Sequence, residues 1–183
     1  LVVVLGVSTG VSASLLMLLL KLAQHLAYGY SSGSFLAGAR AAPDWRRFAA
    51  LIAAATIIAV GVFALGRLPS SGGSEVSGSL WMRGGRLDFL PSIGRALLSI
   101  VTVGMGVSLG REAAPQLVGA ATASRLADWA ALPTWQRRLL VAAGAGAGFA
   151  AVYNVPLGGA LFALEVLLGL SLIHISEPTR QAE

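Results

Sequence analysis

The chain has 183 residues, of which 56% are hydrophobic and only 11% are charged, whereas ordinary soluble domains carry about 25% charged residues. Its mean hydropathy is +0.77. This composition argues against a disordered chain, a nucleic-acid-binding protein and a soluble globular domain. The chain has no cysteine and two histidines, so we expect no disulfides, no metal site and no cofactor. The net charge is +5, and because Lys and Arg are scattered between apolar runs, we interpret it as membrane-flanking charge.

The apolar runs, taken in chain order, predict an all-α membrane protein. Residues 1–20 and 48–65 carry no charge, and each run approaches the roughly 20 residues that cross a bilayer. Three later runs are shorter or interrupted by Gly or Pro, at 96–109, 139–152 and 157–173. We expect the polar connection at 23–47 to lie at a membrane surface, and further polar stretches follow at 66–95 and 124–138, the last with Trp near Arg as in the headgroup region of a membrane. The sequence therefore predicts a bundle of tilted and broken transmembrane helices.

Broken apolar helices point to function, because lipid offers no hydrogen-bond partner to an exposed helix end. Transporters and channels use such ends to build ion sites. The start of a helix leaves N–H groups unpaired and carries partial positive charge, so several converging starts would attract an anion. Three segments combine turn-forming residues with an adjoining helix, at 70–78, 110–116 and 142–168. In the third, Asn154 and Pro156 are suited to the N-cap and the first turn of a new helix.

Glu112 is the most informative single residue, since a carboxylate in a mostly apolar region is costly and indicates a functional site. At a helix start, its carboxylate would be attracted by the same N–H groups as the anion. It could therefore occupy the position of the anion and block it, and protonation would release it. The alternative is an ordinary acid paired with a nearby Arg at a membrane surface.

The three segments resemble, in the same order, the CLC family of chloride channels and chloride/proton exchangers. That family has a GSGIP segment, often followed by Glu-Val, then GREGP or GKEGP. A helix pair similar to AAGAAAGLAAAFNAPLAG follows and ends in phenylalanine and glutamate. The corresponding stretches here read SSGGSEV at 70–76, GREAAPQ at 110–116 and AAGAGAGFAAVYNVPLGGALFALE at 142–165.

The resemblance implies that residues 1–169 form part of the first inverted repeat of a CLC-type transmembrane domain. It places the anion-coordinating serine at Ser71 and the gating glutamate at Glu112. Supporting motif positions are Gly72, Gly110, Arg111, Asn154 and Pro156. It further implies chloride or a similar small anion as the transported ion, a multi-pass cell-membrane location in the lipid bilayer, a homodimer in the full-length protein, and no enzymatic activity.

The sequence does not decide between a channel and a chloride/proton exchanger. Many exchangers carry a second, proton-transferring glutamate directly after Glu165, where this chain has Val166, and this difference favours a channel. Protons would be a second transported ion only if the protein is an exchanger. We expect Glu165 itself to be a structural acid at a helix end.

Both ends of the sequence are atypical. The chain begins at Leu1 inside an apolar run, which indicates a truncated start rather than a signal peptide. Residues 170–180 read LSLIHISEPTR, similar to one reading frame of a sequencing-library adapter, so we interpret residues 170–183 as a non-native tail. The second inverted half of the family's fold is missing from this sequence, and we expect the fragment alone not to conduct anions.

Three other functions compete with transport. Residues 139–148, LLVAAGAGAG, could be a strand and a Gly-rich phosphate turn of a dinucleotide-binding oxidoreductase, but Phe149 stands at the third glycine of that motif. An intramembrane serine protease would need a histidine partner, and none lies in a credible segment outside the tail. A non-transporting structural membrane protein would tolerate loss of Glu112.

Overall fold

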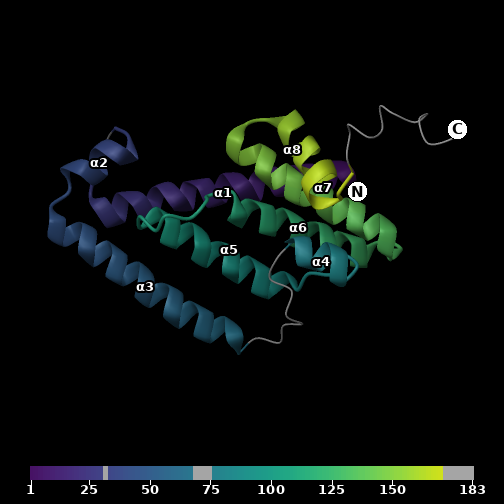
Figure 1. The fold of residues 1–183 in the computed structure, drawn as a ribbon, viewed down its shortest axis with the longest axis horizontal. Coiled ribbons are helices and arrows are strands. Elements are labelled where there is room, and N and C mark those ends of the chain that lie inside the picture. Colours follow the sequence, from purple (N-terminus) through teal and green to yellow (C-terminus); the bar gives the residue numbers. More distant parts are fainter. Residues whose placement is uncertain (31–32, 68–75, 171–183) are drawn as a thin grey trace, which may run out of the picture.

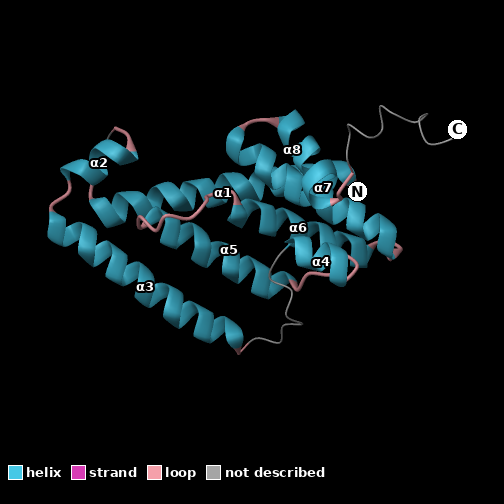
Figure 2. Cartoon of the chain, in the orientation of Figure 1, coloured by secondary structure: helices cyan, strands magenta, loops and turns pink. Residues whose placement is uncertain are grey.

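Helices form all the regular structure of the residues described, which are 1–30, 33–67 and 76–170 of this computed structural model (Figures 1 and 2). The prediction of an all-α fold is confirmed. In chain order the helices are α1 (Val2–Tyr28), α2 (Phe35–Ala41), α3 (Asp44–Gly66), α4 (Val76–Met82), α5 (Phe89–Gly104), α6 (Ala113–Trp129), α7 (Thr134–Tyr153) and α8 (Pro156–Phe162), and a π-helical turn, η1 (Ala163–Leu167), continues α8.

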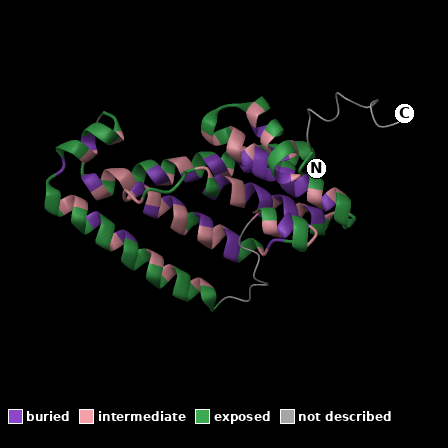
Figure 3. Cartoon of the chain, viewed as in Figure 1, coloured by how far each residue is buried: buried purple, intermediate pink, exposed green. Residues whose placement is uncertain are grey.

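Helices α1 and α3 are long and apolar enough to cross a membrane, judged by length and composition. Apolar side chains cover their outer faces. On α3, Ile52 is 68% exposed and Phe63 is 64% exposed, while Ala50 and Ala54 are buried. Figure 3 shows this contrast, with α3 mostly exposed and buried residues gathered around α6 and α7. Contact with lipid would remove these apolar side chains from water.

The core of the fold is the packing of α6 against α7, which small residues bring together at very short range. A Cβ atom at Gly119 on α6 would collide with the carbonyl oxygen of Gly144 on α7. A Cβ atom at Gly148 would likewise collide with the carbonyl of Pro115. Only glycine permits this approach, in the manner of small residues between membrane helices. The Gly-rich stretch at 139–148 is therefore the interior of a helix, which contradicts the strand that a dinucleotide-binding turn requires.

Helix α5 joins the core to the outer helices. It lies between α1 and α3 (Figure 1) and also packs on α6. Ala96 and Ile100 of α5 are fully buried in a cluster with Leu16 and Leu20 of α1 and Val118 of α6. The cluster also contains Ala114, so it holds α5 against the start of α6.

The polar stretch 124–138 lies mostly within helices. Helix α6 continues to Trp129, α7 begins at Thr134, and Ser124 is completely buried. Arg137 is also buried, and its guanidinium donates a hydrogen bond to the Asp128 carboxylate at 2.7 Å. This ion pair joins α6 to α7. Trp129 is nevertheless 81% exposed, as the interface between membrane and water favours.

Candidate functional site

Glu112 lies directly before α6 and is the N-cap of that helix. Its carboxylate makes no capping hydrogen bond to the helix. Instead, the hydroxyl of Tyr153, at the end of α7, donates a hydrogen bond to Glu112 Oε2 at 3.0 Å. The expected position at a helix start is thus observed. The carboxylate, however, points to a neighbouring helix rather than to the N–H groups of its own.

The surrounding motif residues hold this arrangement. The Arg111 guanidinium lies 5.6 Å from the centre of the Tyr153 ring, a distance suited to a cation–π contact. A Cβ atom at Gly110 would collide with the Glu112 carboxylate, so glycine there leaves space for that side chain.

The turn between α7 and α8 follows Tyr153 immediately. Pro156 is at the first position of α8, as predicted. Asn154 was predicted to be the N-cap of α8, and this is wrong: it ends α7 in a left-handed conformation, with φ 56° and ψ 42°, and Val155 is the N-cap. Asn is one of the few side chains that adopt this conformation readily.

A cavity of about 410 Å³ begins one residue beyond Glu112. Four parts of the chain surround it: the starts of α4 and α6, the middle of α5, and the end of α8 with η1. Its lining residues are Val76, Ser77, Arg95, Ala96, Ser99, Ala113, Ala114, Gln116, Leu117, Phe162, Val166 and Leu167. Glu112 does not line it. In this structure the carboxylate is therefore held beside the cavity and outside it.

Arg95 is a residue of this site that the sequence analysis missed. It lies on α5 and lines the cavity, and its Nη1 atom is buried without a hydrogen-bond partner among the described residues. The sequence gives no clear signal for it, because Arg95 stands at the end of a polar stretch that also contains Arg83 and Arg86.

The other predicted site residues either lie outside the described residues or do not line the cavity. Ser71 and Gly72 lie among residues 68–75, outside the described residues, although the segment leads directly to Val76 in the cavity wall. Glu165 is exposed in the π-helical turn. Val166, its neighbour, lines the cavity.

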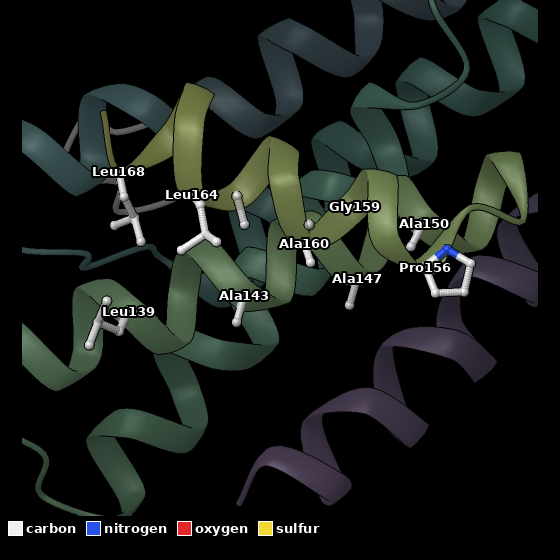
Figure 4. Close-up of a pocket in the computed structure, with 11 residues that line it drawn as sticks. Leu139, Ala143, Ala147, Ala150, Pro156, Gly159, Ala160, Leu164 and Leu168 are labelled. Carbon is white, nitrogen blue, oxygen red and sulfur yellow. The ribbon is translucent and has the colours of Figure 1, made fainter. Parts of the chain in front are cut away.

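A second hollow, of about 480 Å³, lies between α7 and the α8–η1 segment (Figure 4). Leu, Ala, Gly and Pro residues alone form its lining. It offers an ion no side-chain donor and no charge, so the cavity beside Glu112 is the better candidate for an anion site.

Comparison with known proteins identifies the family. The described residues form a helical fold with two helices long and apolar enough to cross a membrane, and with a cavity of mixed polar and apolar lining where several helices begin or end. The family model described as voltage gated chloride channel matches residues 49–176, and the chain belongs to this CLC family. No solved structure matched the chain.

Two curated relatives are bacterial proteins. A voltage-gated ClC-type chloride channel ClcB of Yersinia pseudotuberculosis is 34% identical over 156 residues, covering 82% of this chain and 37% of that protein. The ClcB protein of Escherichia coli K12 is 39% identical over 89 residues, covering 49% of this chain and 21% of that protein. The matched part of the chain therefore spans little more than a third of the Yersinia pseudotuberculosis protein and about a fifth of the Escherichia coli protein.

Proposed function

We propose that this chain forms part of a protein that moves chloride, or a similar small anion, across a membrane, as a channel or as a chloride/proton exchanger. Its relatives carry the name of chloride channels. The observation that carries the proposal is the cavity of about 410 Å³ at the start of α6, next to Glu112. In this proposal the cavity is the binding site of the anion, and the hydroxyl of Ser71, in the segment that precedes α4, donates a hydrogen bond to the anion.

Electrostatics supports the choice of an anion. The first N–H groups of the 17-residue helix α6 carry partial positive charge toward the cavity. Arg95 adds a full positive charge, and the described lining residues include no carboxylate. A cation would be repelled by this wall, whereas an anion would be attracted to it.

Glu112 acts as the gate in this mechanism. Its ionised carboxylate competes with the anion for the start of α6, and a neutral carboxyl does not. The bond to Tyr153 corresponds to the state in which the carboxylate has left the cavity free. Protonation would favour anion passage at low pH, and in an exchanger the same group would carry the proton.

The test is a chimera, because the chain spans only 37% of the length of the Yersinia pseudotuberculosis relative. The matching segment of that relative is replaced by this chain, and chloride efflux from proteoliposomes is followed at acidic and at neutral pH. We expect Glu112→Gln and Glu112→Ala to abolish the pH dependence while chloride still moves. Glu165→Gln, which changes an exposed acid, is the matched control and should behave as the parent chimera.

Two results would decide against the proposal. If the Glu112 variants keep the full pH dependence of the parent chimera, Glu112 is not the gate. If the parent chimera folds and inserts but moves no anion, the segment serves a non-transporting structural role instead.

We place residues 1–169 in a CLC-type transmembrane domain of a multi-pass cell-membrane protein that forms a homodimer at full length. We also retain residues 170–183 as a non-native tail, although the family match runs to residue 176. Sequencing the source DNA across codon 170 decides this: an uninterrupted genomic reading frame through the tail would disprove it.

A further inference from the structure

We propose that the apolar hollow between α7 and the α8–η1 segment binds an acyl chain of an anionic phospholipid, and that Arg138 binds the phosphate of this lipid at the mouth of the hollow. The ligand is a lipid of the bilayer rather than the transported ion. The site is independent of anion transport and therefore goes beyond the proposed function.

Two hollows meet near the start of α7. The apolar hollow, of about 480 Å³, follows α7 from Leu139 to Ala150 and lies against α8 and η1 (Figure 4). The other, of about 270 Å³, lies between the end of α4, the start of α7 and the end of η1. Leu139 and Leu168 line both hollows. One elongated molecule could therefore extend from the smaller hollow into the larger.

The smaller hollow has the side chains of an interface between membrane and water. Trp81 and Trp135 line it together with Arg138, and the two tryptophans are 59% and 62% exposed. The Arg138 guanidinium lies 5.0 Å from the centre of the Trp81 ring. Tryptophan is enriched at the level of the lipid headgroups, and a guanidinium binds phosphate oxygens through paired N–H bonds. This mouth is therefore suited to a lipid phosphate.

The charge at the mouth favours an anionic lipid. Among the described residues, none that lines either hollow is acidic. Gly85 packs on the backbone of Arg138, whose Cα lies 3.3 Å from the position of a Cβ on Gly85, so the turn that carries Arg83 and Arg86 lies at the same end. The 20-residue helix α7 also begins here, and its first N–H groups add partial positive charge. A headgroup with net negative charge complements this end better than a zwitterionic one.

The larger hollow is suited to an acyl chain. Leu, Ala, Gly and Pro form its whole lining, and the short side chains of Ala143 and Ala160 leave it open on the outer face (Figure 4). From Leu139 to Ala150 the hollow extends about 16 Å along α7, away from the mouth. Within a bilayer, an acyl chain in this position gains close packing rather than release from water.

The experiment uses the complete 183-residue chain in detergent, and native mass spectrometry measures the binding of dioleoyl phosphatidylglycerol and dioleoyl phosphatidylcholine. We expect the parent chain to bind the anionic lipid more tightly. Arg138→Gln should weaken phosphatidylglycerol binding about fivefold and leave phosphatidylcholine binding unchanged. Arg67→Gln is the matched control, because Arg67 also lies over an aromatic ring, that of Phe63 at 4.2 Å, but lines neither hollow. Its lipid affinities should equal those of the parent.

A second pair of variants tests the acyl chain. Ala143→Phe places a ring in the apolar hollow without a change of charge, and we expect both lipids to bind about threefold or more weakly. Ala151→Phe changes an exposed residue of α7 that does not line the hollow, so this variant should bind both lipids as the parent does. Helical circular dichroism identifies any variant that fails to fold.

A third measurement needs no substitution. Glycerophosphoglycerol is the soluble headgroup without acyl chains, and an equal concentration of it should not displace phosphatidylglycerol from the parent chain. Displacement by this headgroup, or by inorganic phosphate, would indicate a site for free anions and overturn the lipid assignment.

Three further outcomes would also overturn the inference. The first is equal affinity of the parent chain for the two lipids, and the second is a folded Arg138→Gln chain with the parent affinity for phosphatidylglycerol. The third is an Ala143→Phe chain that forms fewer dimers but binds lipid normally, because the hollow would then be an interface between copies of the chain. The chloride flux of the chimera tests the proposed function separately.

Discussion

The hydroxyl of Tyr153 donates a hydrogen bond to the carboxylate of Glu112, and this bond joins residues that are 41 positions apart in the sequence. It links the end of α7 to the start of α6. Because Arg111 lies over the ring of Tyr153, two consecutive residues of the GRE segment (110–112) contact the same tyrosine. The α7 terminus thus positions the acid that we propose as the gate.

Removing the Tyr153 hydroxyl should strengthen the block by Glu112. In the chimera, Tyr153→Phe keeps the ring and removes the bond that holds the carboxylate outside the cavity. We expect chloride efflux at neutral pH to fall about threefold to tenfold, with little change at acidic pH, where the carboxyl is more often neutral. The ratio of the acidic to the neutral rate should therefore rise.

Tyr30→Phe is the control for this prediction. It removes a tyrosine hydroxyl that bonds to Gln24, away from the GRE segment, and should leave the pH profile unchanged. If Tyr153→Phe and Tyr30→Phe give the same profile, Tyr153 does not position the gate.

Some helices could be predicted from the sequence because their composition reports on their surroundings. The charge-free run at 48–65 lies inside α3, and the run at 1–20 lies inside α1 except for its first residue, and apolar side chains cover the outer surface of both helices. Helix α6 could not be delimited in this way. Its second half contains Ser124 and Asp128, which indicate a surface loop in isolation.

Tertiary contacts explain why those polar residues belong to a helix. The Ser124 hydroxyl accepts a hydrogen bond from the Leu87 N–H at 3.0 Å, and Asp128 binds Arg137. The same limit applies to the site. Glu112 and Pro156 could be found from local motifs, but Tyr153 and Arg95 belong to the site because distant segments meet there, which no local pattern reports.

The close approach of α6 and α7 predicts a steep penalty for side chains at Gly119. Gly119→Ala would place its Cβ against the Gly144 carbonyl, so the helices must separate. We expect a loss of about 1–3 kcal/mol in the free energy of unfolding, as overpacking of a core typically costs. Unfolding of the purified chain in mixed micelles with increasing denaturing detergent measures it.

Gly6→Ala on α1 is the matched control, because no atom lies within 4 Å of the Cβ position at Gly6. This change should be neutral or slightly stabilising, since alanine favours helix more than glycine does. Equal stability of both variants would show that α6 and α7 do not approach as closely as the structure has them.

The 183-residue chain alone should not conduct chloride. Among the described residues, two helices are both long and apolar enough to cross a membrane, and α4 and α8 have seven residues each. A complete path therefore needs walls from further segments, consistent with the 37% coverage of the Yersinia pseudotuberculosis relative. Liposomes that contain only this chain should release chloride no faster than empty liposomes, and robust, chloride-selective release would disprove this.

The ion pair between Asp128 and Arg137 predicts unequal effects of its two halves. The Arg137 side chain is 8% exposed and that of Asp128 is 51% exposed. Asp128→Asn leaves a buried guanidinium with a weaker partner, and we expect a loss of about 1–3 kcal/mol in the free energy of unfolding. Arg137→Met removes the buried charge and leaves a half-exposed carboxylate that water can solvate, so this variant should lose less of the free energy of unfolding.

The exposed pair of Arg47 and Asp44 is the control, and Asp44→Asn should change stability by less than about 1 kcal/mol. Unfolding in mixed micelles ranks the three variants, and an Arg137→Met chain less stable than Asp128→Asn would contradict the asymmetry that burial predicts.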